Sequence, residues 1–555
     1  MPQRTKHILI LLFLGVVFYL PFLGGVHLFD WDEINFAEVS REMLLYGEFL
    51  RVYIDFKPFW EKPPFFFWLQ ATGMHFLGVG EYAARLPNAI NGIITLLLVY
   101  AIGSKMYSPR FGFFWALTFF GSILPFLYSK SGIIDPWFNL FIFLGIYLFI
   151  LFYWKKEGFE GIRLSYNAWL YLIVGGLAIG MGIMTKGPVA FLIAALTLGV
   201  YWVMQRFRWY ASPLHFFVFT LAALVIMFTW YGLETLKNGS WFIMEFNRYQ
   251  YRLFSTPDAG HKGFPGYHVA VLLIGVFPAS IFAMRSFFRM EKEQLPHQQD
   301  FMRWMKILFW VVLVLFSIVQ SKIVHYSSMC YLPMTYLAAV VIYQWWEGKL
   351  AFSRWMQAGI ISIGSLYILA TLALPWLGRN TEKLKPLFES DPFALGNLEA
   401  DVHWSGWESL SGVWLILVIF FALRFFRRTN LRWGIPILFI GTAVFIFWTL
   451  ISSINNIEKY SQNAAISFFQ DRQGEDCYVR PIGYKSYAHL FYTMKAPVTN
   501  PNSYDQEWLL TGPIDKPAYF ITKEGKTDRM LQYTDVKELG RKNGFVFYRR
   551  EPVTQ

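Results

Sequence analysis

The sequence predicts an α-helical, polytopic membrane protein of about thirteen transmembrane helices, followed by a small C-terminal extracytoplasmic α/β domain. Hydrophobic residues make up 55% of the 555 positions and charged residues only 15%, and the mean hydropathy is +0.37. Soluble domains carry roughly 25% charged residues and expose few large apolar patches. Apolar stretches of about 20 residues, the length that a spanning helix needs, recur along the chain as far as residue 453.

The first candidate span runs from Ile8 to Leu28, after a short basic start. No small-residue cleavage site follows it, which favours a retained helix over a cleaved signal peptide. A turn at Lys186-Gly187-Pro188 is expected to separate two of the other spans. These other candidates lie near residues 84–104, 110–128, 133–154, 167–186, 188–205, 213–232, 267–287, 303–320, 326–346, 354–377, 409–426 and 433–453.

The positive-inside rule places the N-terminus in the cytoplasm, because the loops that then alternate to that side are short and basic. They include Lys155-Lys156, Arg206 with Arg208, and the run from Arg424 to Arg432. The net charge of +12 therefore indicates contact with anionic lipid headgroups. No nucleic-acid partner is expected, since no basic patch lies on a recognisable nucleic-acid-binding motif.

Two domains follow from this layout. Residues 1–454 form the membrane domain, in which the segment 29–83 is the first outer loop, and residues 455–555 form the polar α/β domain. Within the second domain, β-like runs at 477–480, 518–522 and 545–548 surround a helix-like stretch at 486–494. With an odd number of spans, this domain lies on the outer face.

The start of the first outer loop is dense in acidic residues. Asp32, Glu33 and Glu38 accompany apolar residues at roughly helical spacing, with Asp32 at the expected N-cap. In one interpretation Asp32 caps the helix and the other acids complement its dipole. In the other, a carboxylate at this membrane edge accepts a proton from an incoming hydroxyl or amine.

Basic residues recur on the same outer face. Lys62 precedes Pro63-Pro64 and a short aromatic helix expected in the interface, so its ammonium is predicted at phosphate depth. Asp135 and Lys186 stand at span ends, where ionisable groups are costly unless paired or functional. A phosphate or pyrophosphate would suit the whole set, and separate headgroup contacts are the alternative. The set is Lys62, Lys186, Arg252 and Lys322.

Nucleotide and metal cofactors receive little support from the sequence. No glycine-rich nucleotide loop or Walker motif occurs, and a donor at an outer face has to be delivered on a lipid. Glu61, His261, His268 and His325 could converge on a divalent metal, but no ligand spacing fixes them.

Four segments resemble the polyprenyl-phosphate-sugar-dependent glycosyltransferases of the GT-C superfamily, especially the bacterial lipid A aminoarabinose transferases and the protein O-mannosyltransferases. The order and span placement match along most of residues 1–350. The segments are Asp32-Glu33-Ile34-Asn35-Phe36-Ala37-Glu38 with Arg41-Glu42-Met43, Glu61-Lys62-Pro63-Pro64 with Trp68, Lys186-Gly187-Pro188, and Ser321-Lys322 through Tyr326 with Leu332-Pro333.

The resemblance implies roles for individual residues. Asp32 matches the catalytic acidic residue, Lys62 the lysine that holds the carrier phosphate, and Glu61 an acid at a metal site in one branch. Asp135, Lys186, Arg252 and Tyr326 match polar lining of the cavity. We therefore expect Asp32, Glu33 and Asp135 to be catalytic, and expect substrate contacts from Lys62, Lys186, Arg252, Lys322 and Tyr326.

The implied function is inverting transfer of a sugar from an undecaprenyl-phosphate type of polyprenyl donor to a lipid A-like glycolipid or a protein. The expected location is the outer face of the cytoplasmic (inner) membrane. The alternative is a transporter or flippase of lipid-linked saccharides, which inverted repeats and paired broken helices near the midplane would favour. The charges of this sequence gather at one face instead. The sugar, the acceptor and the oligomeric state stay open.

Overall fold

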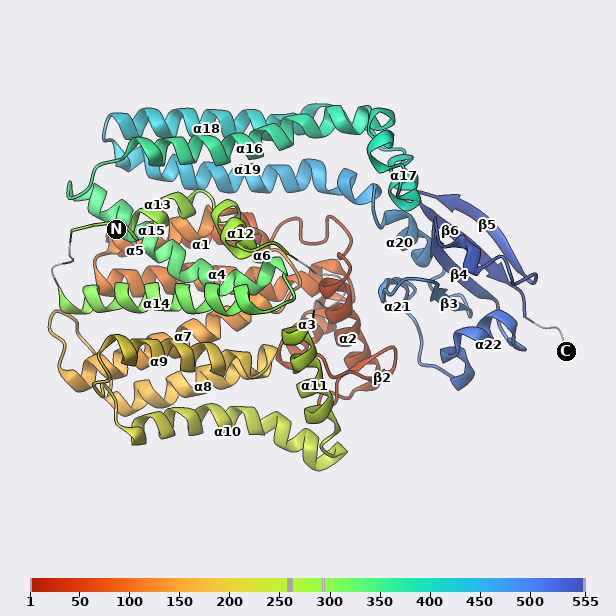
Figure 1. Ribbon diagram of the computed structural model, residues 1–555, viewed down its shortest axis with the longest axis horizontal. Coiled ribbons are helices and arrows are strands. Elements are labelled where there is room, and N and C mark those ends of the chain that lie inside the picture. Colours follow the sequence, from red (N-terminus) through yellow and green to blue (C-terminus); the bar gives the residue numbers. More distant parts are fainter. Residues whose placement is uncertain (1, 257–262, 292, 294, 553–555) are drawn as a thin grey trace.

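The computed structural model describes residues 2–256, 263–291, 293 and 295–552. Long helices form a bundle, a group of shorter elements covers one end of it, and an α/β domain lies beyond that end (Figure 1). We call this end of the bundle the domain end. The N-terminus lies at the opposite end (Figure 1).

The bundle contains helices in all of the predicted apolar segments. They are α1 (Gln3–Tyr19), α4 (Glu81–Met106), α5 (Pro109–Phe120), α6 (Ile123–Tyr128), α7 (Asp135–Glu157), α8 (Ala168–Lys186), α9 (Val189–Met204), α10 (Pro213–Asn238), α12 (Tyr267–Gly275), α13 (Ala279–Arg285), α14 (Pro296–Ile318), α15 (Tyr331–Trp346), α16 (Arg354–Arg379), α18 (Leu410–Arg427) and α19 (Leu431–Lys459).

Within the described ranges, 8 of these helices are long and apolar enough to cross a membrane, or up to 9 if the α12–α13 pair, bent by 116°, is one span. Helices α1, α5, α9 and α15 have 17, 12, 16 and 16 residues and fall short of the required length. The predicted fold class is thus confirmed, while the count of thirteen spans stays a prediction.

Helix α7 illustrates how the sequence sets these boundaries. It begins at Asp135-Pro136, where proline suits the first turn because its missing N–H would have no partner there. It ends before Gly158, whose φ of +67° is a left-handed conformation that glycine adopts without strain. Small residues let neighbouring helices pack closely. A Cβ at Gly176 of α8 would lie 2.3 Å from the carbonyl oxygen of Phe219 in α10, so only glycine permits this approach of the two helices.

Shorter elements cover the domain end. They are α2 (Asp32–Tyr46), the β1–β2 hairpin (Tyr53–Ile54 with Lys57–Pro58), α3 (Phe65–Leu77), α11 (Trp241–Ser255), η2 (Val324–Cys330), η3 (Thr381–Lys383), η4 (Lys385–Phe388), α17 (Pro392–Leu398) and η5 (Trp407–Ser409). The expected N-cap role of Asp32 is wrong: Trp31 occupies the cap, Asp32 is the first helical residue, and no side chain caps the helix.

The C-terminal domain has a four-stranded sheet of order β3-β4-β6-β5, with β3 parallel to β4 and the other pairs antiparallel. Strand β5 was not expected, because it is an edge strand with few buried side chains and lacks apolar alternation. The elements are α20 (Asn463–Gln470), β3 (Tyr478–Pro481), α21 (Ala488–Tyr492), η6 (Pro501–Tyr504), α22 (Gln506–Thr511), β4 (Ala518–Lys523), η7 (Thr527–Arg529), β5 (Val536–Lys542) and β6 (Phe545–Arg550).

The C-terminal domain is held against the first outer loop by polar contacts from both partners. The backbone N–H of Leu28 donates to Tyr492 Oη at 2.7 Å. Asp55 pairs with Lys495 at 2.7 Å, and its carbonyl accepts from Tyr504 Oη at 2.9 Å. Apolar residues of α2, α20 and α21 share one buried cluster beneath these contacts. The loop and the domain are therefore packed as one unit.

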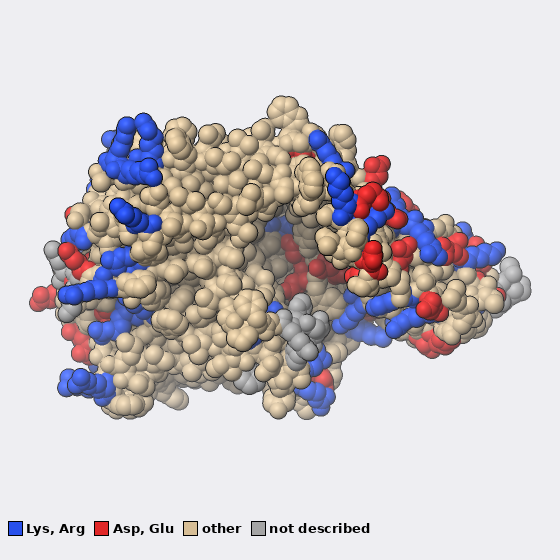
Figure 2. Space-filling view, turned by 45° about the horizontal axis from the view of Figure 1, so that its top comes forward, with Lys and Arg blue, Asp and Glu red and all other residues tan. Residues whose placement is uncertain are grey.

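Charge is distributed unevenly over the surface. Lys and Arg gather at the end of the bundle remote from the C-terminal domain, both signs cover that domain, and largely uncharged surface lies between (Figure 2). The α7–α8, α9–α10 and α18–α19 loops lie at the remote end (Figure 1). The basic loops predicted to share one side of a membrane thus share one end of the molecule.

Candidate active site

A cavity of about 740 Å³ lies at the domain end of the bundle. Figure 2 shows the surface hollowed where the bundle meets the C-terminal domain. The lining residues come from the first outer loop, α7, α8, α9, α11, α14, η2 and the C-terminal domain. Seven of the predicted site residues are among them: Asp32, Glu61, Lys62, Asp135, Lys186, Arg252 and Tyr326.

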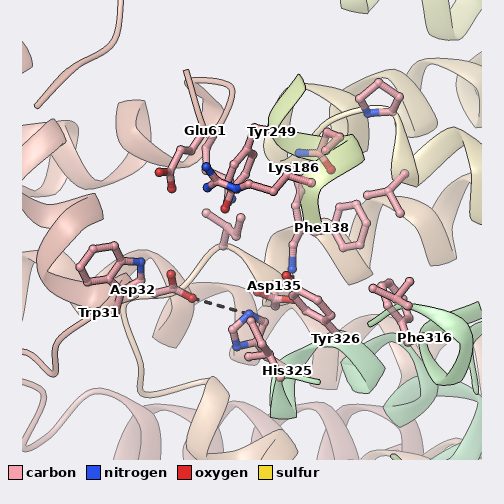
Figure 3. Close-up of a pocket in the computed structure, with 18 of the residues that line it drawn as sticks. Trp31, Asp32, Glu61, Asp135, Phe138, Lys186, Tyr249, Phe316, His325 and Tyr326 are labelled. Atoms are coloured by element: carbon pink, nitrogen blue, oxygen red, sulfur yellow. Dashed lines mark hydrogen bonds and ion pairs between the residues drawn. The ribbon is translucent and has the colours of Figure 1, made fainter. Parts of the chain in front are cut away.

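Asp32 faces a histidine across the cavity. Its Oδ2 lies 3.6 Å from His325 Nε2, and the two side chains are 29% and 17% exposed. Figure 3 shows the carboxylate between the Trp31 ring and this imidazole. Burial lowers the pKa of His325, and the nearby Asp135 opposes that shift only in part, so the ring is neutral at neutral pH. Asp32 therefore has a neutral polar neighbour.

Asp135 and Lys186 form a buried ion pair. Lys186 Nζ donates to Asp135 Oδ1 at 2.6 Å, joining the last residue of α8 to the first residue of α7. The ammonium also lies 5.2 Å from the centre of the Tyr326 ring. Because its charge is matched by Lys186, Asp135 is placed to orient that lysine, and it is a poorer proton acceptor than Asp32.

Two further cations converge on Tyr249 of α11. Lys62 Nζ lies 3.5 Å from Tyr249 Oη and 4.9 Å from the ring centre. Arg252 Cζ lies 5.3 Å from the same ring. Lysine and arginine placed together in this way suit a phosphate group.

The opposite part of the lining is apolar. It consists of side chains from α9 and from the end of α14, namely Val189, Leu192, Leu315, Phe316 and Val319. The cavity thus places a surface suited to hydrocarbon beside a group of charged residues.

Glu33 was expected to be catalytic, but it lies outside the cavity lining. Its carboxylate pairs with Arg85 at 2.7 Å and accepts the N–H of Phe29 at 3.0 Å and that of Gly132 at 2.5 Å. Burial alone would raise the pKa of Glu33, but Arg85 and the two N–H donors hold it below its usual value. Glu33 therefore fastens the first outer loop to the bundle.

Lys322 was expected to contact substrate, and it too lies outside the lining. Its Nζ donates to the carbonyl oxygens of Phe316 at 3.2 Å and Ser317 at 2.6 Å. These carbonyls end α14, where a cation satisfies groups that lack helical partners. Lys322 is thus a cap on α14.

The described residues do not form a group of side chains that could bind the predicted metal ion. In the part of the chain that the structure describes, no three His, Cys, Asp or Glu side chains are grouped so as to hold a metal ion. Glu61 lines the cavity, His268 is buried in α12, and His261 lies outside the described residues. Glu61 as a metal ligand stays a prediction.

Trp31 and Lys485 are among the lining residues that the sequence analysis did not propose for the site. Trp31 precedes Asp32, and Lys485 comes from the loop between β3 and α21 of the C-terminal domain. Trp31 could have been predicted as a lining residue because it directly precedes Asp32, which was predicted to be catalytic. No signal marks Lys485, which is one lysine in a polar segment and reaches the cavity only through the docking of two domains.

The fold and the site together define a class of membrane protein. Over 98% of each chain, the structure resembles the crystal structure of ArnT from Cupriavidus metallidurans bound to undecaprenyl phosphate, with a TM-score of 0.76 and 17% sequence identity. The apo form of the same protein gives a TM-score of 0.73. The chain is a multi-pass membrane protein with the ArnT type of fold.

Comparison of the amino-acid sequence with known proteins gives more specific similarities than the fold does. Residues 61–231 match the family described as dolichyl-phosphate-mannose-protein mannosyltransferase. An undecaprenyl phosphate-alpha-4-amino-4-deoxy-L-arabinose arabinosyl transferase from Pseudomonas aeruginosa is 28% identical over 71% of this chain and 69% of its own length. A protein of the same name from Edwardsiella ictaluri is 26% identical over 65% of this chain, and the match spans 64% of that relative, just under two thirds. The predicted resemblance to lipid A aminoarabinose transferases of the GT-C superfamily is confirmed.

Proposed function

We propose that this protein is a glycosyltransferase that moves a sugar from a polyprenyl-phosphate donor to an acceptor at the outer face of the cytoplasmic membrane. One observation carries the proposal. A carboxylate, Asp32, and a cation, Lys62, line the same cavity as an apolar wall. Such a cavity suits a substrate with a hydrocarbon tail, a phosphate and a sugar.

The donor would lie with its tail along the apolar wall of α9 and α14 and its phosphate at Lys62 and Arg252. In the donor, the phosphate is a diester with one negative charge. When the sugar leaves, it becomes a monoester that carries up to two. The two cations therefore stabilise the departing group more strongly than the bound donor, which lowers the barrier.

The acceptor would approach from the Asp32 side. As its oxygen attacks the anomeric carbon, Asp32 takes the proton and the bond from that carbon to the phosphate oxygen breaks, with its electron pair going to the phosphate. General-base help of this kind contributes on the order of 10²–10⁴-fold. His325, neutral and close, orients the carboxylate. A single displacement inverts the anomeric configuration.

The names of the relatives give the first donor to test, undecaprenyl phosphate bearing 4-amino-4-deoxy-L-arabinose. Lipid A is the first acceptor to test, and a protein hydroxyl is the second. The full chain in lipid nanodiscs should transfer labelled sugar to the acceptor, with inverted configuration by NMR. Movement of labelled donor across a proteoliposome membrane without a new glycosidic bond would support the flippase alternative and overturn the proposal.

The sidedness of the site is part of the proposal. The basic loops lie at the end of the bundle remote from the cavity, which by the positive-inside rule supports a location of the cavity and the C-terminal domain outside the cytoplasm. A periplasmic reporter such as alkaline phosphatase fused after Gly474 should be active, and the same reporter fused after Arg428 should be silent. An inverted result would place the site on the cytoplasmic face.

A further inference from the structure

The loop between β3 and α21 extends from the C-terminal domain to the cavity. Its Lys485 Nζ lies 4.7 Å from the centre of the Trp31 ring and 5.3 Å from that of Tyr487. The two rings are 5.7 Å apart, with an angle of 35° between their planes. One lysine and two aromatic rings thus meet at the seam between the first outer loop and the C-terminal domain.

The ammonium groups of Lys485 and Lys186 have different neighbours. The Lys186 ammonium is bonded to Asp135, whereas Lys485 is exposed and has no ion pair among the described residues. Its described neighbours are ring faces, which attract a cation but leave its N–H groups free for other acceptors. An anion entering the cavity would therefore find an available donor here.

The position of this seam separates it from the donor side. Lys62 and Arg252 meet at Tyr249 of α11, while Lys485 lies over Trp31, the residue next to Asp32. With a donor phosphate at Lys62, the acceptor has to reach Asp32 from the Trp31 side. Lys485 is then beside the acceptor and away from the carrier phosphate.

We propose that Trp31, Tyr487 and Lys485 form an acceptor subsite for an anionic saccharide headgroup, with its phosphate or carboxylate on Lys485 and its ring over the aromatic faces. Aromatic rings offer broad apolar area, and a charge-assisted hydrogen bond fixes the anion. The inference rests on the proposed function, because only in a glycosyltransferase is the bound headgroup an acceptor of sugar. It adds that the C-terminal domain selects which acceptor is used.

The test compares lipid A with enzymatically dephosphorylated lipid A, using the full chain with Lys485→Ala and Lys485→Arg variants. For wild-type protein, KM for lipid A should be on the order of 10- to 100-fold lower than for the dephosphorylated form, the range expected for one charge-assisted bond. Lys485→Ala should remove that difference while donor KM stays unchanged, and Lys485→Arg should restore most of it. Lys537→Ala, on the exposed edge strand β5, is the matched control and should behave as wild type.

Native mass spectrometry without donor separates this inference from the proposed function. Preferential binding of lipid A that depends on Lys485, with no sugar transfer by wild-type protein, would sustain the subsite and sink the glycosyltransferase. Equal binding of both lipids by wild-type protein, or an undiminished preference in Lys485→Ala, would overturn the subsite. So would an equal loss of phosphatidylglycerol binding in Lys485→Ala, because the lysine would then be a general headgroup contact.

Discussion

The two faces of helix α2 carry the same types of residue in opposite circumstances. In its buried part, Glu33 is paired with Arg85 of the bundle, and Glu38 and Arg41 are paired with each other. At the cavity, Asp32 is partly exposed, and the neutral ring of His325 lies 3.6 Å from its carboxylate. The difference shows that burial with full pairing makes an acidic residue structural, while the acid left beside an open space is the one available for chemistry.

A second buried group of polar residues links α2 to the C-terminal domain and to the β1–β2 hairpin. Arg41 donates to both carboxylate oxygens of Glu38 at 2.7 Å and to the carbonyl of Lys495 at 2.9 Å. Glu42 accepts the N–H of Phe56 at 3.0 Å. Burial and then the nearby Glu38 raise the pKa of Glu42 to about 9, so this carboxyl is protonated at neutral pH.

The largest effect is expected from Asp32→Asn. Asparagine keeps the shape but cannot accept the proton, so turnover should fall by on the order of 10²–10⁴-fold. Because Asp32 makes no capping bond, the thermal unfolding midpoint and donor binding should stay near wild type. A sugar-transfer assay beside a thermal melt checks both. An active variant would remove Asp32 from the mechanism.

Glu33→Gln should act on the fold. It leaves the buried Arg85 guanidinium without its carboxylate, a loss on the order of 3–5 kcal/mol for a buried pair. The unfolding midpoint and the yield should drop, while turnover per folded molecule, counted by active-site titration, should change little. Normal stability with lost turnover would instead return Glu33 to the catalytic set.

Lys62→Ala should raise the donor KM by about tenfold or more, because one charge-assisted contact to phosphate is lost. The acceptor KM should not change, which distinguishes this lysine from Lys485. Lys57→Ala, an exposed lysine in the same loop, is the matched control. Unaltered donor affinity in Lys62→Ala would mean that the side chain only extends toward headgroups.

The smallest effect concerns pH. The folded-state pKa of Glu42 is raised to about 9, so the folded chain holds a proton that the unfolded chain releases above about 4.5. The stability that this proton contributes is full below pH 4.5 and disappears as the pH rises through 9. Glu42→Gln cannot ionise, so its unfolding midpoint should decline less between pH 6 and 9 than that of wild type. Parallel declines would show that Glu42 is ionised in the folded protein.

The helical bundle was predictable because hydropathy reports burial in lipid or protein directly. Each apolar segment is helical, with 110–128 and 267–287 divided into two helices each, and Lys186-Gly187-Pro188 separates α8 from α9 as expected. The span count was not settled, because α5 and α15 are apolar yet short. Strand β5 was missed, since the edge of a sheet needs no apolar alternation.

The site was predictable where a polar residue ends an apolar segment. Asp135 and Lys186 were found in this way, and they meet at 2.6 Å. The same reasoning did not show that Lys322 lies outside the lining, because depth in the membrane does not say which way a side chain points, and this side chain points to the end of α14. Lys485 could not be predicted from the sequence, since it reaches the cavity only because the C-terminal domain packs against the first outer loop.

The seam between the first outer loop and the C-terminal domain joins residues that are synthesised at very different times. Leu28 and Asp55 leave the ribosome early, whereas their partners Tyr492 and Lys495 are synthesised after every helix of the bundle. The loop that carries Asp32 and Lys62 is thus synthesised, and can be fastened to the bundle by Glu33, long before its contacts with the C-terminal domain can form. A nascent chain that ends before the sheet domain should insert its helices and yet remain inactive, so that completion of synthesis is itself the activating event.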